Sequence, residues 1–219
     1  MNREKASFFD TQADQDWADA EYSPEEKAKI QRLIQETGIK TGTRIVEPGC
    51  GTGRLTKILS DTVGDQGRVT AFDISAEMIA KCRSRLEHRR NVEIYLSSTE
   101  DFLFEKQSVD MILCHQVFPH FDDKPLAVRI LAHALKPKGK FIVFHFKNSA
   151  WINDLHRKAH TSVIADMIPL QQEMKSMFEA VGMKIDTLRD DEEGYFLSAT
   201  FGLKTGWSYI AEKYFSTLR

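Results

Sequence analysis

The chain has 219 residues, of which 42% are hydrophobic and 28% are charged, and its formal net charge is −2. These values are ordinary for a globular domain, and the length suits one α/β domain with a small addition. Nucleic acid is not an expected partner, because the strongest basic clusters, within 81–90, read as the solvated face and end of one helix.

The cysteines favour a reducing compartment. Cys50, Cys82 and Cys114 are odd in number and show no C-x-x-C spacing, which argues against a disulfide framework and a cysteine zinc site. The N-terminus lacks the apolar core of a signal peptide, and no apolar run approaches transmembrane length. We therefore expect a cytoplasmic monomer or homodimer with no membrane partner.

Residues 1–22 are polar but contain scattered aromatic side chains. One interpretation is a flexible leader. The other is a segment that folds back onto the domain, because aromatic rings need an apolar place to bury. The next residues predict a helix, since Ser23 can serve as N-cap, Pro24 suits the first helical position and Glu26 completes a capping box. This helix is expected to end at Gly38.

The stretch 44–60 predicts a strand, a glycine-rich turn and a helix, in that order. Residues 44–47 read as a short buried strand, Pro48 starts the turn, and 55–60 reads as the helix. This order places a helix N-terminus against the carboxyl end of a strand. The geometry suits a nucleotide-like ligand, because glycines let the backbone approach closely and the first helical N–H groups point outward.

The spacing of Gly49, Gly51 and Gly53 indicates which ligand is expected. The dinucleotide fingerprint G-x-G-x-x-G would require a glycine where this chain has Arg54. Glu47 also stands two residues before the first glycine. A carboxylate there would repel a pyrophosphate but attract the cationic amino-acid end of a ligand. The remaining alternative is a glycine-rich loop without a ligand.

A second candidate contact follows on the next strand. Residues 68–74 predict a strand that ends in Asp73, which lies about 20 residues beyond Gly53, the offset at which an acidic residue meets ribose hydroxyls in such folds. The alternative role for Asp73 is to cap the helix predicted from Ser75 to Glu87.

The rest of the chain continues the alternation of strands and helices. The residues 136–139 predict a helix stop and a turn, and the extra segment 147–168 predicts one helix followed by an extended turn. Such alternation argues for a doubly wound, mostly parallel α/β sheet. The expected strands are 92–96, 109–115, 140–146, 183–188 and 195–199, and the expected helices are 125–135 and 171–181.

Four features together resemble the class I S-adenosylmethionine (SAM) dependent methyltransferases, most closely the group that includes ubiquinone and menaquinone biosynthesis methyltransferases. They are E-x-G-x-G-x-G at 47–53, Asp73, the segment 108–118, which resembles the family's fourth motif and whose end would border the transferable methyl, and L-x-x-x-L-K-P-K-G-K-F at 131–141, where Lys138 replaces a common glycine. The resemblance spans about 45–146. It implies a Rossmann-like seven-stranded sheet with an antiparallel last strand, here with a helical insertion after strand five.

The resemblance also implies the cofactor-binding residues. Glu47 would orient the amino-acid end of SAM, the three glycines would allow close approach, and Asp73 would hold the ribose. The loop after the third strand would touch adenine, although the family commonly has an acidic residue where this chain has Ser98. The full expected set is Glu47, Gly49, Gly51, Gly53, Asp73, Ile74, Ser98, Thr99, Glu100 and His115.

The domain organisation implied is an N-terminal lid at 1–22, a methyltransferase domain at 23–200 and a C-terminal tail at 201–219, with 147–168 as an inserted helix over the active site. The expected function is methyl transfer from SAM to a small-molecule acceptor by in-line displacement. One alternative is a non-catalytic SAM-binding or regulatory protein. Another is an NAD(P)-dependent oxidoreductase, which Arg54 and Glu47 disfavour.

Five histidines are expected to converge near the carboxyl ends of the fourth and fifth strands, with Asn153 and Asp166 close by. In one hypothesis a histidine is a general base, and His115 or His145 is the first choice. In a second, His145, His156 and His160 bind a divalent transition metal such as zinc, since the H-x-x-x-H spacing puts two of them on one helix face. The third is that they make ordinary polar contacts or face solvent. The five are His115, His120, His145, His156 and His160.

Overall fold

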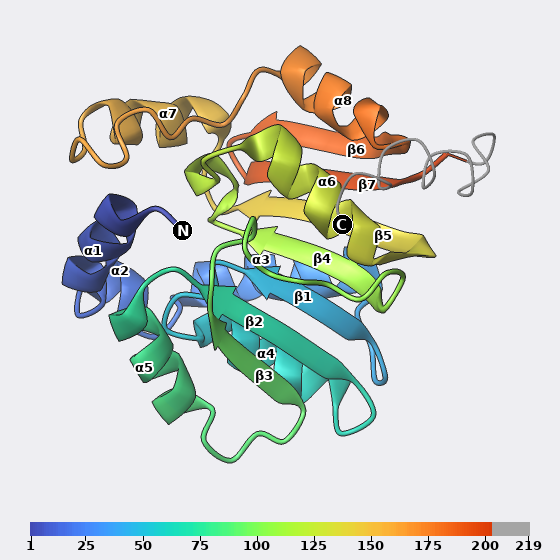
Figure 1. Cartoon of the computed structure of the whole chain (residues 1–219), viewed down its shortest axis with the longest axis horizontal. Helices are drawn as coiled ribbons and strands as arrows, with labels where there is room; N and C mark the ends of the chain where they lie inside the picture. The colour runs from blue at the N-terminus through green and yellow to red at the C-terminus, as the bar shows by residue number, and fades with distance from the viewer. Residues whose placement is uncertain (203–219) are drawn as a thin grey trace.

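A computed structural model gives the fold and describes residues 1–202 of the chain. Within this range, seven strands form one sheet (Figure 1). The strands are β1 (Arg44–Pro48), β2 (Arg68–Asp73), β3 (Val92–Leu96), β4 (Val109–His115), β5 (Leu135–His145), β6 (Met183–Asp191) and β7 (Gly194–Phe201). Their order is β3-β2-β1-β4-β5-β7-β6, with β1 to β5 paired in parallel and β7 antiparallel to both neighbours. The predicted doubly wound sheet with an antiparallel last strand is confirmed.

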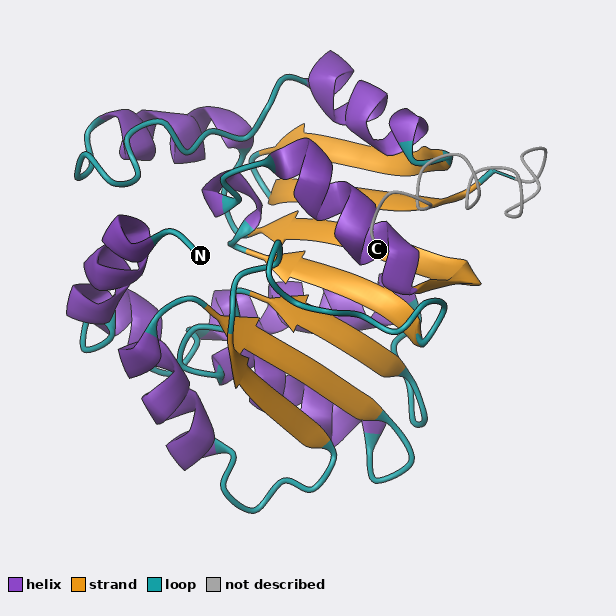
Figure 2. Ribbon diagram, in the orientation of Figure 1, coloured by secondary structure: helices purple, strands orange, loops and turns teal. Residues whose placement is uncertain are grey.

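Helices cover both faces of this sheet (Figure 2). One face packs against α3 (Pro24–Thr37), α4 (Arg54–Val63) and α5 (Ala76–Arg85), and the other against α6 (Lys124–Ala134) and α8 (Gln171–Ala180). Each face of the sheet has its own hydrophobic core, and successive side chains of β4 alternate between the two. Met111 and Leu113 belong to the core under α3, α4 and α5, and Ile112 and Cys114 belong to the core under α6 and α8. Burial on both faces explains why the central strands are apolar throughout.

The helix predicted after the N-terminal segment begins and ends as expected. Ser23 Oγ accepts a hydrogen bond from the Glu26 amide, and Glu26 accepts one from the Ser23 amide, which completes the capping box of α3. Gly38 ends the helix in the left-handed region, with φ of 77°.

The turn predicted at 136–139 is wrong, because these residues lie inside β5. The strand starts at Leu135, directly after α6. It pairs with Val109 there, but the next pair joins Met111 to Lys140, so the register shifts across the segment. Pro137 therefore falls in a bulge, where its missing N–H breaks no ladder hydrogen bond.

Three helices lie beyond the carboxyl ends of the parallel strands (Figure 1). They are α1 (Arg3–Gln12), α2 (Asp16–Asp19) and α7 (Ser149–Arg157). Ion pairs hold the N-terminal pair of helices to the domain, since Arg85 and Lys81 on α5 both contact the Asp19 carboxylate at 2.8 Å. The segment 1–22 thus packs on the domain.

The last strand, β7, ends at Phe201, the first residue of the predicted C-terminal tail. Residues 203–219 of that tail, with Trp207, Tyr209, Tyr214 and Phe215, lie outside the described residues. Among the helices of residues 1–202, none is long and apolar enough to cross a membrane.

Candidate functional site

The turn between β1 and α4 has a backbone that only glycine adopts easily. Gly49, Gly51 and Gly53 have φ of 64°, 54° and 82°. A Cβ on Gly49 would lie 2.2 Å from a methyl carbon of Val117, so the turn also passes too close to the β4 end for a larger residue.

A cavity of about 140 Å³ opens where this turn meets the carboxyl ends of the strands. Its lining includes motif residues together with residues of α1, among them Lys5 and Phe9. Seven of the predicted cofactor residues line it, namely Gly49, Gly51, Asp73, Ile74, Ser98, Thr99 and Glu100. Three predicted ones, Glu47, Gly53 and His115, are not among its lining residues.

The Asp73 carboxylate is fixed in place by backbone groups. Its Oδ2 accepts a hydrogen bond from the Gly51 amide at 2.9 Å, and its Oδ1 accepts one from the Ser75 amide at 2.9 Å. The N-cap of α5 is Ser75, so the alternative in which Asp73 caps that helix is not what the structure shows. Each carboxylate oxygen keeps a further lone pair for a ligand in the cavity.

Glu47 is a buried carboxylate at the end of β1. It is 2% exposed, and its Oε2 has no hydrogen-bond partner among the described residues. Burial, with a smaller contribution from the charge of Asp73, raises the pKa of Glu47 to about 8. An unpaired buried carboxylate is costly, and a cationic group reaching under the glycine turn would remove that cost. The amino-acid end of SAM carries such a cationic group, an ammonium that can donate hydrogen bonds to the carboxylate.

The loop after β3 offers one free acceptor to the cavity. Ser98 Oγ donates to Asp101 Oδ2 at 2.8 Å and accepts from the Asp101 amide at 3.2 Å, so its hydroxyl is used within the loop. Glu100 Oε1 is buried and has no partner among the described residues. For the predicted adenine contact, Glu100 is therefore a freer side-chain acceptor than Ser98.

The two histidines chosen as bases do not line the cavity. His115 and His145 are 7% and 3% exposed. Burial lowers the pKa of His115 to about 3, and burial together with neighbouring histidines lowers the pKa of His145 well below its ordinary value. His115 packs against aromatic rings instead, with centroids 5.3 Å from Phe144 and 4.8 Å from Phe146.

The predicted metal ligands are not brought together. Helix α7 ends at Arg157, so the prediction that His156 and His160 share a helix face is wrong. His156 Nδ1 bonds to the Asp166 carbonyl, whereas the His160 ring stacks on Phe8 at 5.2 Å. Within residues 1–202, no group of three or more His, Cys, Asp or Glu side chains is arranged to hold a metal ion. His145, His156 and His160 therefore do not form the predicted zinc site.

Of the histidines in the described part of the chain, His120 is the one that lines the cavity. The sequence placed it at the end of β4 but gave it no role. Several other lining residues were given no individual role, among them Asn2, Lys5, Phe121 and Asp122. Gln116 and Val117, which also line the cavity, belong to the segment likened to the family's fourth motif. A lone lysine in a polar leader carries no motif, so no sequence signal pointed to Lys5.

A family model described as "Methyltransferase domain" matches residues 39–188, which is more than half of the chain. The ubiquinone/menaquinone biosynthesis C-methyltransferase of Shewanella woodyi is 31% identical over 130 residues, 58% of this chain and 51% of that protein. The enzyme of the same name from Vibrio parahaemolyticus is 34% identical over 116 residues, 52% of this chain and 45% of that protein. The chain thus spans about half the length of the curated relatives it matches.

Solved structures show the same fold at low identity. A SAM dependent methyltransferase from Aquifex aeolicus matches with a TM-score of 0.64 and 19% identity, covering 89% of this chain and 96% of that one. The [4+2]-cyclase SpnF matches with a TM-score of 0.65 and 15% identity, covering 84% and 85%. Since a cyclase shares the fold, fold similarity alone does not specify the reaction. The matched family and the motif residues at the cavity together do specify the family: the chain belongs to the methyltransferase domain family and is a class I SAM-dependent methyltransferase.

Proposed function

We propose that this protein transfers the methyl group of SAM to a small-molecule acceptor by in-line displacement. The observation that carries the proposal is that one cavity is lined both by motif residues and by His120, Phe121 and Phe9. A cofactor held by the motif would therefore point into a space lined by aromatic rings and one imidazole.

The residues present fit SAM. The glycine turn allows close approach, Asp73 is poised for the ribose, Glu100 offers an acceptor to the adenine, and the unpaired Oε2 of Glu47 suits the ammonium group. Bound SAM supplies an activated methyl whose carbon–sulfur bond breaks with its electron pair left on sulfur. The protein must then hold the acceptor in line with that bond and exclude water.

The segment 1–22 acts as a lid in this proposal. Its residues Asn2, Lys5, Phe9 and Trp17 line the cavity, and the cavity of about 140 Å³ is smaller than the roughly 300–1,000 Å³ of common small-molecule sites. Entry of a cofactor and an acceptor therefore requires α1 to move. A site closed by a helix favours a small acceptor over a macromolecule. The named relatives act in quinone biosynthesis, and the aromatic lining suits a ring-containing acceptor of that kind.

Replacing Asp73 with alanine is expected to weaken SAM binding more than tenfold. The variant loses the carboxylate that faces the ribose and the anchor of the Gly51 amide, and hydrogen bonds to charged groups contribute about 1.5–3 kcal/mol. Isothermal titration calorimetry with S-adenosylhomocysteine measures the change. An unchanged affinity would remove Asp73 from the site.

The proposal is tested by binding and transfer together. The purified protein is titrated with S-adenosylhomocysteine and with NADH, and transfer of labelled methyl from SAM to a panel of small phenols, thiols and amines is followed by mass spectrometry. Binding of S-adenosylhomocysteine with methylation of a probe supports the proposal. Tight binding without transfer to any acceptor favours a non-catalytic SAM-binding protein. A response to NADH alone would reverse the assignment.

A further inference from the structure

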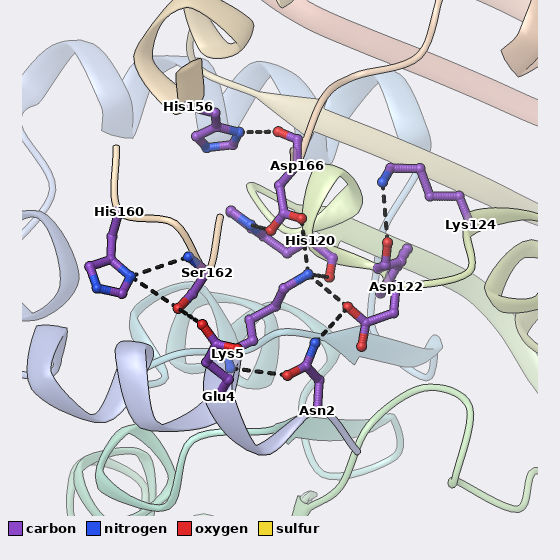
Figure 3. A network of polar contacts seen from close by, with 11 residues as sticks. Asn2, Glu4, Lys5, His120, Asp122, Lys124, His156, His160, Ser162 and Asp166 are labelled. Carbon is purple, nitrogen blue, oxygen red and sulfur yellow. Dashed lines mark hydrogen bonds and ion pairs between the residues drawn. The ribbon is translucent and has the colours of Figure 1, made fainter. Parts of the chain in front are cut away.

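Charged side chains from separate segments meet at the end of the cavity that α1 covers (Figure 3). The centre of the group is Lys5, which is 4% exposed. Its ammonium donates to the His120 carbonyl at 2.9 Å, to Asp122 Oδ1 at 2.9 Å and to Asp166 Oδ1 at 3.0 Å. All three donors of the lysine are therefore used, and the cation binds two carboxylates from different parts of the chain.

His120 ends the short 3-10 helix η1 (Phe118–His120) and faces the cavity. Its Nδ1 lies 2.8 Å from Asp166 Oδ2. Because an ionised carboxylate only accepts, the neutral ring holds its proton on Nδ1 and carries its lone pair on Nε2. The hydrogen bond of the His120 side chain to a described residue is made by Nδ1 and not by Nε2, and the Phe9 ring packs edge-on against the imidazole at 5.1 Å.

The charge of Asp166 is balanced without a charged imidazole. Burial opposes its ionisation, but the hydrogen bonds and positive charge around it, from His120 and Lys5, lower the pKa of Asp166 below its ordinary value. Burial lowers the pKa of His120, although the bond to Asp166 acts in the opposite direction. His120 is therefore a neutral, oriented imidazole at neutral pH, which is the state that a proton acceptor requires.

Other titratable groups also face His120. The His156 ring on α7 lies 4.9 Å from it, centroid to centroid, and the Nδ1 of His156 bonds to the carbonyl of the same Asp166. His145 on β5 contributes a further neutral ring. Asp122 and Lys124 follow η1, and burial lowers the pKa of Lys124. Lys5 and His156 favour the neutral form of His120, while Asp166 favours its charged form.

We propose that His120 is the general base of the methyl transfer, that Asp166 and Lys5 position it, and that the acceptor carries an ionisable proton on its attacking atom. Phenols, thiols and carbon acids have this chemistry. The inference rests on the proposed methyl transfer and deepens it by specifying the acceptor. A tertiary amine, or any other acceptor without a proton on its attacking atom, would not require a general base such as His120.

The proton balance of the step is simple. The bond between the proton and the attacking atom of the acceptor breaks, and Nε2 of His120 takes the proton. The electron pair freed on the acceptor forms the new bond to the transferred methyl carbon. The positive charge that the sulfonium loses ends on the imidazolium of His120, next to the carboxylate of Asp166. His115 and His145 cannot take this part, because their Nε2 atoms are enclosed and do not reach the cavity.

The first test needs no acceptor. His120→Asn and Asp166→Asn are compared with wild type, with His88→Asn as the control because His88 is exposed and far from the named groups. Imidazole nitrogen NMR at pH 7 is expected to show neutral His120 with its proton on Nδ1, and Asp166→Asn is expected to change that tautomer. S-adenosylhomocysteine affinity is expected to stay within threefold in His120→Asn. A proton on Nε2 of wild-type His120, or lost cofactor binding in His120→Asn, would overturn the proposal.

The second test uses transfer to hydroquinone, thiophenol and acetylacetone, with pyridine as a proton-free acceptor. General bases contribute about 10²–10⁴-fold, so His120→Asn is expected to lower transfer to the first three by at least 100-fold and to leave pyridine little changed. Added imidazole is expected to restore part of the rate in His120→Ala. An equal loss on pyridine, or no transfer by wild type to any proton-bearing probe while S-adenosylhomocysteine still binds, contradicts the acceptor class. Failure to bind S-adenosylhomocysteine would instead contradict the proposed function.

Discussion

Glu47→Gln is expected to stabilise the cofactor-free protein and to weaken its binding of SAM. The wild-type carboxylate is 2% exposed, and its Oε2 has no hydrogen-bond partner among the described residues. Burial raises its pKa from the ordinary 4.5 to about 8, so the folded protein disfavours the charged form that SAM requires. The glutamine has the same shape and no charge to desolvate.

The sign of the pH dependence follows from that shift. Because the folded-state pKa lies above the unfolded value, the folded protein holds an extra proton between about pH 4.5 and 8, and wild-type stability falls as pH rises through this window. One pKa unit corresponds to about 1.4 kcal/mol. The free energy of unfolding of Glu47→Gln is therefore expected to exceed that of wild type by roughly 3–5 kcal/mol at pH 8, and to differ little from it at pH 4.5. Urea denaturation of both proteins at several pH values measures this.

The second part of the prediction, weaker cofactor binding by Glu47→Gln, is measured separately. If the ammonium of the ligand meets Glu47, binding at pH 6–7 should release close to one proton, and loss of a buried charge pair should cost about 2 kcal/mol or more, which is at least 30-fold in affinity. Calorimetric titration with S-adenosylhomocysteine in buffers of different ionisation enthalpy measures both. Stabilisation without a change in affinity or proton release would show that Glu47 lies outside the cofactor contacts.

The cofactor half of the site is predictable from the sequence because it is local. The glycines of the turn, the carboxylate at the end of β2 and the loop after β3 each follow a strand directly, and parallel strands end at one edge of the sheet. Capping and alternation likewise located most helices and strands, since these signals lie within a few residues of one another.

The acceptor half is not local, and the sequence did not reveal it. Lys5 and Asp166 are 161 positions apart, and neither belongs to a motif. The metal hypothesis failed for a related reason. It assumed that α7 continues to His160, but the helix ends at Arg157 although no glycine or proline follows before Pro169.

Lys5→Met is expected to release α1 from the domain. Methionine keeps most of the length of the side chain but removes the ammonium that pairs with both Asp166 and Asp122. Removing one partner from a buried pair costs about 3–5 kcal/mol. Because Asp122 is 47% exposed, we expect a smaller cost than this, about 2–3 kcal/mol, which appears as local opening of residues 3–12.

Hydrogen exchange followed by mass spectrometry tests this directly. A cost of about 2–3 kcal/mol corresponds to roughly 30–150-fold faster exchange in 3–12, while the strands keep their protection. Lys158→Met is the matched control, because Lys158 is 72% exposed and pairs with Asp154 only across one turn of α7. In the proposed lid role of α1, S-adenosylhomocysteine should also dissociate faster from Lys5→Met, by stopped flow, than from the control. Unchanged exchange in both variants would show that the contacts of α1 with α5, and not Lys5, hold the lid closed.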